Sequence, residues 1–129
     1  MSDSTLLLEF TGRKSGRRLS TPISYHINGG FAHCFTNRNF HWWRNLQNGQ
    51  TVGLRVSGKS YQSAPEVETQ NLDVMRSALN DFLRAVPRDA AHAGVKLDKL
   101  GNPDQQDIHQ VVNDMVYLKF PIDRDRVDT

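Results

Sequence analysis

The chain has 129 residues, of which 37% are hydrophobic and 23% charged, and this balance suits one domain with a packed core rather than a disordered chain. The formal net charge of +2 is too small to require a nucleic-acid partner. No apolar run approaches the ~20 residues of a membrane span, and the run at residues 6–8 lacks the basic flank of a secretion signal. We therefore expect a cytoplasmic protein without a transmembrane segment, forming a single domain over residues 1–129.

Period-two alternation of apolar residues predicts strands in the first half of the chain. We expect these strands at residues 5–10, 19–27, 31–36, 50–56 and 59–68. The apolar face of the second strand carries Leu19, Ile23, Tyr25 and Ile27. Pro22 cannot donate to a ladder, so it is expected at an edge, a bulge or a break that faces a ligand. Residues 28–30 predict a tight hairpin because Gly29 and Gly30 adopt positive φ easily, and residues 42–47 predict a short helix.

The second half of the chain changes to a helical period. An apolar stripe predicts a helix over residues 72–86, with Asn71 as its N-cap and Pro87 as its stop. We then expect a helical turn at 88–94, a loop at 96–103, a weak helix at 104–113, a strand at 115–122 and a frayed tail at 123–129. These elements predict a mainly β fold with flanking helices, of the α+β class, built as a small β-barrel. The antiparallel hairpins disfavour a parallel doubly wound sheet.

The densest chemical signal is a basic turn at residues 11–18, where four of the sixteen basic residues fall within six positions. Gly12 and Gly16 let the backbone curl and turn its N–H groups inward. An arginine holds a phosphate through two parallel hydrogen bonds and a lysine adds a point charge, so the turn suits a phosphate or another anionic tail. Two other interpretations stay open: a solvated hairpin turn, and a nucleic-acid patch, although no aromatic array is interleaved with the charges.

The second signal is the segment at residues 37–46, which contains both tryptophans of the chain, Trp42 and Trp43. Neighbouring side chains on a helix point about 100° apart, so one indole can be core while the other lines a cavity. A planar ring can stack on an indole, and Asn45 can hydrogen-bond a carbonyl or hold the loop. The alternative is that both tryptophans cap the interior of the barrel.

No pattern of residues marks a nucleophile or a metal site. The lone Cys34 lies on a predicted strand and excludes an internal disulfide and a multi-cysteine zinc site. The five histidines show no pair at metal-ligand spacing, and no nucleophile elbow is present. We therefore predict no metal and leave the catalytic side chain unknown.

Several segments of the chain together carry a family resemblance. They are Thr-Gly-Arg-Lys-Ser-Gly at residues 11–16, Ser-Thr-Pro at 20–22 followed by Tyr25, Trp-Trp-Arg-Asn-Leu at 42–46, Val-Gly-Leu-Arg-Val at 52–56, the stretch 61–68, and Val-Pro-Arg-Asp-Ala-Ala at 86–91. With them the chain resembles the deazaflavin-dependent nitroreductase family of actinobacteria over about residues 5–122. The basic turn and the two-tryptophan segment are fairly specific in combination.

The resemblance implies a split β-barrel related to oxidases that bind flavin mononucleotide (FMN). Characterised members of the family bind a deazaflavin, coenzyme F-420, and pass its hydride to nitroaromatics, quinones or enones. Relatives bind FMN, haem breakdown products or fatty acids, so FMN is the alternative cofactor. The alternative function is a non-catalytic binder of a flavin, tetrapyrrole or fatty acid, and a third alternative is a relative whose own side chains fill the pocket. Split barrels often pair, which implies a homodimer.

By position, the resemblance implies that the coenzyme's phosphate and acidic tail lie at Arg13, Lys14, Ser15 and Gly16, assisted by Arg17 and Arg18. It implies a ring bordered by Pro22 and Tyr25, a strand-end loop of Thr36, Asn37 and Arg38 near that ring, and closure by Trp42 or Trp43. Hydride transfer needs no side-chain nucleophile, because the cofactor carries that chemistry. The lack of a triad or metal motif is therefore expected.

Overall fold

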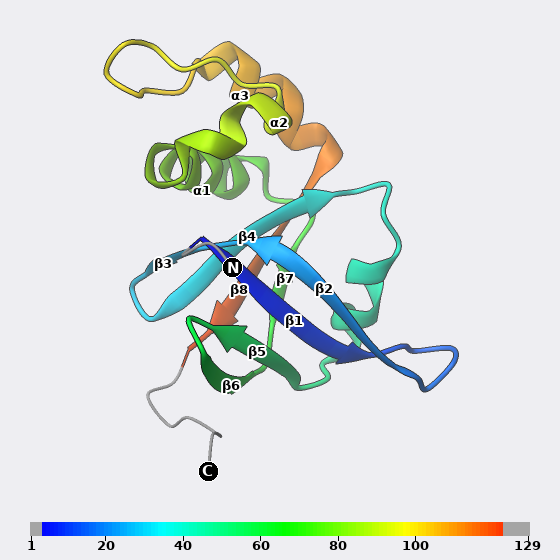
Figure 1. Cartoon of the computed structure of the whole chain (residues 1–129). Helices are drawn as coiled ribbons and strands as arrows, with labels where there is room; N and C mark the ends of the chain where they lie inside the picture. The colour runs from blue at the N-terminus through cyan, green and yellow to red at the C-terminus, as the bar shows by residue number, and fades with distance from the viewer. Residues whose placement is uncertain (1–3, 123–129) are drawn as a thin grey trace.

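Figure 1 shows the computed structural model of the chain, which describes residues 4–122. Within these residues, eight strands form two four-stranded antiparallel sheets, sheet A in the order β2-β1-β5-β6 and sheet B in the order β3-β4-β8-β7. The strands are β1 (Thr5–Thr11), β2 (Arg18–Ser24), β3 (His26–Asn28), β4 (Phe31–Asn37), β5 (Val52–Val56), β6 (Lys59–Ser63), β7 (Glu66–Glu68) and β8 (Met115–Pro121).

One hydrophobic core lies between the two sheets. Buried and half-buried residues alternate along β1, so that Leu6, Leu8 and Phe10 point inward. Sheet B contributes Cys34 from β4 and Leu118 from β8 to the same cluster, and both are fully buried. Each strand therefore presents alternate residues to the core and to its outer face, and this alternation decides which side chains can reach a ligand.

The strand predicted at residues 19–27 is wrong as a single element. The chain leaves sheet A at Ser24 and enters sheet B at His26, and the buried Tyr25 lies at the crossing, where its N–H donates to the Ser4 carbonyl at 2.9 Å. The predicted buried face also fails at its ends, because Leu19 is 37% and Ile27 47% exposed. Period-two alternation continues through the bend, so the pattern does not reveal a change of sheet.

The strand predicted at residues 59–68 divides in the same way, into β6 of sheet A and β7 of sheet B. The break contains Pro65, which has no N–H to continue a ladder. The other predicted strands are confirmed, as is the hairpin turn at residues 28–30, where Gly29 and Gly30 have φ values of 62° and 82°.

The helices α1 to α3 gather at one end of the two sheets, while η1 lies beside them (Figure 1). The α-helices are α1 (Leu72–Ala85), α2 (Ala90–Ala93) and α3 (Gln105–Val111). The described residues also form 3-10 helices, labelled η1 (Trp42–Asn48), η2 (Pro87–Asp89) and η3 (Val112–Asp114). The Asn71 side chain caps α1 by accepting a hydrogen bond from the Val74 N–H at 3.2 Å, as predicted. The buried face of α1 forms a second core with Ile108 and Tyr117.

The predicted class, mainly β with flanking helices, is confirmed by the two sheets and the helices at their end. None of the helices within residues 4–122 is long and apolar enough to cross a membrane. The tail predicted at residues 123–129 lies outside the described residues.

Candidate functional site

The basic turn forms the tip of the hairpin between β1 and β2. Its backbone closes on itself: the Gly12 N–H donates to the Arg17 carbonyl at 2.8 Å and the Gly16 N–H to the Gly12 carbonyl at 2.9 Å. The Ser15 hydroxyl accepts from the Arg17 N–H at 3.2 Å. The N–H groups expected to cradle an anion are therefore largely used within the protein. The exposed side chains of Arg13, Lys14 and Arg17 form no hydrogen bond or ion pair with any residue in 4–122, which leaves their charge for a ligand.

Arg18 differs from the other basic residues of the turn. It pairs with Thr11 across the ladder, and its guanidinium lies 3.5 Å from the Thr11 hydroxyl on the outer face of sheet A. A Cβ at Gly53 would lie 3.3 Å from that guanidinium, so the glycine in β5 leaves room for the arginine. The Arg18 side chain therefore extends across sheet A rather than toward the tip of the hairpin.

Asn45 and Gln50 join the hairpin to η1. The buried Asn45 side chain accepts from the Arg13 N–H at 2.7 Å and donates to the Trp42 carbonyl at 2.8 Å, which confirms its predicted loop-holding role. Gln50 accepts from the Thr11 N–H at 2.8 Å and donates to the carbonyls of Thr11 and Asn45 at 2.9 and 2.8 Å. The two segments singled out in the sequence thus lie against each other. The sequence analysis did not identify Gln50, because its partner Thr11 lies 39 positions away in the chain.

The two tryptophans have different environments, as the helical spacing predicts. Trp43 is 4% exposed, and its Nε1 donates to the Arg38 carbonyl at 3.2 Å. Trp42 is half-buried, lies 6.0 Å from the ring of Phe10, and lines a cavity. Trp43 is therefore a core residue, and Trp42 is the indole that lines the cavity.

The larger cavity has a volume of about 660 Å³ and lies between β2, the end of β4, α1 and α2. Four predicted site residues line it: Pro22, Thr36, Asn37 and Trp42. Sequence reasoning did not identify its opposite wall, which comes from helices. This wall has Leu79, Phe82 and Leu83 on α1, Asp89 on η2 and His92 on α2. The helical stripe indicates that the α1 residues are buried, but no sequence signal places them against a cavity. The volume falls within the range of small-molecule sites.

Other predicted site residues do not line this cavity. Tyr25 is 7% exposed and belongs to the core between the sheets. The Arg38 side chain donates to three backbone carbonyls, those of Thr69 at 2.7 Å, Met115 at 3.2 Å and Asn113 at 3.3 Å. Arg38 therefore ties the segment before α1 to the start of β8.

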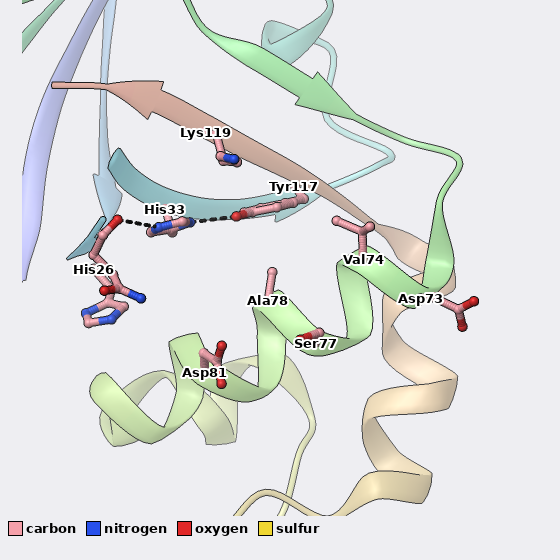
Figure 2. A pocket seen from close by; sticks show the side chains of 10 residues that line it. His26, His33, Asp73, Val74, Ser77, Ala78, Asp81, Tyr117 and Lys119 are labelled. Carbon is pink, nitrogen blue, oxygen red and sulfur yellow. Dashed lines mark hydrogen bonds between the residues drawn. The ribbon is translucent and has the colours of Figure 1, made fainter. Parts of the chain in front are cut away.

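A second cavity of about 450 Å³, here called the α1 cleft, lies between α1 and the outer face of β3, β4 and β8 (Figure 2). In it, His33 Nδ1 lies 2.6 Å from the Tyr117 hydroxyl and His33 Nε2 lies 3.0 Å from the Asn28 carbonyl. Burial raises the pKa of Tyr117 to about 12.

Cys34 lies on the opposite face of β4, in the core between the sheets. Burial raises the pKa of its thiol, which keeps the thiol protonated and inert.

Solved structures share this fold at low sequence identity. A candidate 5-nitroimidazole antibiotic resistance protein from Bacteroides thetaiotaomicron matches 95% of this chain and 74% of its own, with a TM-score of 0.67 at 12% identity. A candidate pyridoxamine 5′-phosphate oxidase from Listeria innocua matches 99% of this chain and 90% of its own, with a TM-score of 0.59 at 7% identity. The chain has a split β-barrel fold. This confirms the architecture that the sequence resemblance implied.

An Agrobacterium tumefaciens protein of unknown function matches 93% of this chain with a TM-score of 0.65 at 12% identity. This chain spans about half, 48%, of that protein's length. No protein-family model matches the chain, and no curated protein matches it.

Proposed function

We propose that the larger cavity holds the planar ring of a flavin-type coenzyme, in the first place the deazaflavin coenzyme F-420, and that the protein is a reductase. The observation that carries this proposal is the contact made by Asn45. It fastens the hairpin with the free cations to η1, whose Trp42 lines the cavity. A molecule with a flat ring and a charged tail needs these two features side by side.

The cavity suits a flat aromatic ring. Trp42 and Phe40 supply aromatic surface on one side, and Phe82 supplies it on the other. Pro22 presents a rigid ring without an N–H on the β2 side. Thr36 and Asn37 add a hydroxyl and an amide that can hydrogen-bond the polar edge of a ring system. These residues fit a mainly apolar ligand with a few polar groups.

The hairpin suits the charged tail of such a molecule. Among residues 4–122, the cations of the hairpin without a protein partner are Arg13, Lys14 and Arg17, and Arg17 lies four residues from Thr21, which lines the cavity. At a rise of ~3.3 Å per residue, Arg17 lies about 13 Å along the chain from the cavity wall. An extended sugar-alcohol chain between ring and phosphate bridges a gap of that scale. Cationic side chains then hold the phosphate through charge-assisted hydrogen bonds.

The bound coenzyme would supply the hydride, which an apolar electrophile such as a nitroaromatic, quinone or enone would accept. The protein's own residues have three tasks: Trp42 and Pro22 border the ring, the α1 side chains exclude water, and the hairpin anchors the tail. Positioning two reactants near contact in a dry site accounts for catalysis without a side-chain nucleophile. We also propose one domain, and a homodimer that sedimentation of the purified chain tests.

The apolar α1 wall of Leu79, Phe82 and Leu83 favours a second candidate function. The same cavity would accept a fatty acid or a tetrapyrrole without turnover, using the hairpin for the ligand's carboxylate. FMN is the alternative coenzyme for the reductase.

Tryptophan fluorescence tests the proposal, because Trp42 borders the cavity. The purified protein is titrated separately with coenzyme F-420, FMN and palmitate. We expect saturable quenching by F-420, weakened about 10- to 100-fold by Lys14→Ala because one charge-assisted contact contributes ~1–3 kcal/mol. Affinity should fall as salt rises. The matched control is Lys59→Ala, an exposed lysine at the turn between β5 and β6.

The outcomes separate the candidates. Quenching by F-420 together with oxidation of its reduced form by a nitroaromatic supports the reductase. Binding of palmitate alone supports the second candidate. Equal effects of Lys14→Ala and Lys59→Ala, or no quenching by either F-420 or FMN, contradict the proposed site.

A further inference from the structure

The α1 cleft has a floor built from the outer face of sheet B. Across three neighbouring strands, the register aligns His26 of β3 with His33 of β4, and His33 with Lys119 of β8. The His33 and Tyr117 rings are nearly parallel, with centroids 5.9 Å apart and an interplanar angle of 10°. His26, His33, Tyr117 and Lys119 line this side of the cleft, and Figure 2 shows His33 and Tyr117 between the sheet and α1. The floor therefore combines aromatic surface with the Lys119 ammonium, and Glu66 of β7 is the register partner of Lys119 on its other side.

The hydrogen bonds of His33 define its state. A carbonyl only accepts, so His33 Nε2 donates to the Asn28 carbonyl at 3.0 Å, while His33 Nδ1 lies 2.6 Å from the Tyr117 hydroxyl, which can donate to it. The Tyr117 oxygen keeps its lone pairs, so it remains an acceptor for a ligand. Lys119 makes no ion pair in residues 4–122, and its ammonium lies 4.2 Å from the centroid of the Phe31 ring.

The opposite wall is the polar face of α1. Asp73, Ser77 and Asp81 lie four residues apart and so share one side of the helix, where all three line the cleft. Asp73 already forms an ion pair with Arg76. Asp81 has no hydrogen bond or ion pair among the described residues, and its charge acts on both His26 and Tyr117. The helix wall therefore presents one uncompensated carboxylate toward the floor.

Apolar surface lies between these two charges. Val74 is 44% exposed although it is apolar, and it lines the cleft together with Ala78 one helical turn later. Both point toward the rings of His33 and Tyr117 in Figure 2. Among residues 4–122, the cleft thus holds the Asp81 carboxylate and the Lys119 ammonium, which form no ion pair with each other or with another residue, and an apolar strip beside them.

We propose that the α1 cleft binds a small zwitterion of the amino-acid class with an apolar side chain, its ammonium on Asp81 and Tyr117 and its carboxylate on Lys119. A purely cationic ligand would meet the Lys119 charge, and a purely anionic one would meet Asp81 and Asp73. A zwitterion satisfies both free charges at once, and its side chain covers Val74 and Ala78. This site is separate from the larger cavity and does not depend on the proposed reductase function.

Nuclear magnetic resonance titration of the ¹⁵N-labelled full chain tests the site. The probes are L-leucine and L-phenylalanine, each compared with its amide, which lacks the negative charge, and its N-acetyl derivative, which lacks the positive charge. We expect saturable shifts of the amides of Ala78, Lys119 and His26 with the free amino acids. Each derivative should bind about tenfold more weakly, because it loses one charge-assisted contact.

Variants assign the two ends of the ligand. Asp81→Asn should weaken binding of the free amino acid about tenfold and leave the N-acetyl derivative unaffected, whereas Lys119→Met should spare the amide. The matched control is Glu9→Gln on β1 of sheet A, which lies outside the cleft and should change affinity less than twofold. The proposal is overturned if neither amino acid shifts these resonances at millimolar concentration. Equal binding of the derivatives, or shifts centred on Trp42, overturn it as well.

Discussion

The two cavities share α1 as a wall but differ in where their charge lies. On the larger cavity, α1 presents Leu79 and Phe82, and the free cations lie outside the cavity on the β1–β2 hairpin. In the α1 cleft the charges stand in the walls themselves, with Asp81 on the helix and Lys119 on the sheet. One amphipathic helix therefore contributes its apolar side to one cavity and its polar side to the other.

The difference teaches how each cavity can select a ligand. In the larger cavity the apolar α1 wall would select a ligand by shape, Asp89 and His92 add polar groups near α2, and the hairpin would hold the tail of the coenzyme that we propose. In the α1 cleft the opposed charges of the walls would select the compact zwitterion that we propose. The following predictions separate the parts that hold each arrangement together.

Arg38→Met should have the largest effect, because Arg38 holds the segment before α1 against β8 and so positions the wall that both cavities share. Its guanidinium serves three carbonyls, and hydrogen bonds to charged groups contribute ~1.5–3 kcal/mol each. We expect the free energy of unfolding to fall by about 3 kcal/mol in urea titration. Arg44→Met is the control, since the Arg44 guanidinium only lies 5.3 Å from the Trp43 ring centroid. A loss no larger than that of the control would show that the three contacts do not hold α1 in place.

Asn45→Ala should separate the larger cavity from its charge. The change removes the buried amide that joins the Arg13 N–H to the Trp42 carbonyl and should cost about 2 kcal/mol of stability for two lost hydrogen bonds. Affinity for F-420 should fall even where the variant is folded, while L-leucine binding to the α1 cleft stays unchanged. Gln47→Ala, at an exposed position of η1, provides the control. Unchanged F-420 affinity in folded Asn45→Ala would argue against the link between hairpin and cavity.

Tyr117→Phe should act on the α1 cleft alone. It leaves His33 Nδ1 without its donor, which should cost about 1 kcal/mol of unfolding free energy. Because burial raises the pKa of Tyr117 to about 12, the protonated phenol is favoured in the folded state. The protonated phenol therefore stabilises the folded state at pH values below 10, the ordinary pKa of tyrosine. This stabilisation is lost as the pH rises from 10 toward about 12. Alkaline urea titrations should show this loss in the wild type and in Tyr61→Phe but not in Tyr117→Phe.

The smallest effect is expected from acidification of the α1 cleft. Burial and the nearby His33 lower the pKa of His26 below 6.5, although Asp81 opposes the shift. Folding thus favours the neutral His26 ring. This preference adds to the free energy of unfolding above pH 6.5 and is lost as the pH falls below 6.5. The groups that face this cleft are His26, His33, Asp73, Asp81, Tyr117 and Lys119.

Protonated His26 would also compete with the ligand's ammonium for Asp81, so L-leucine affinity should fall in the same pH range. His26→Gln should flatten both pH profiles. A proton NMR titration that places the pKa of His26 above 6.5 would contradict this prediction.

The candidate site was predictable where it depends on local sequence. The exposed cations of the turn and the divergence of Trp42 from Trp43 follow from residue type and helical geometry, and the structure agrees with both. Arg38 was expected beside a coenzyme but is occupied by three carbonyls. A charged residue in a sequence looks the same whether its partner is a ligand or the protein's own backbone, because the partners come from distant segments.

By itself, the sequence determined the local elements: the paired glycines that turn at residues 28–30, the Asn71 cap, the helical stripe of α1 and the alternation of β1. These depend on backbone preferences and on side chains a few residues apart. Only the tertiary structure decided that Tyr25 marks a change of sheet, that Asn45 joins hairpin and helix, and that His33, Tyr117 and Asp81 meet across one cleft. Such contacts join residues that are tens of positions apart, and their geometry arises only when the two sheets and α1 pack together.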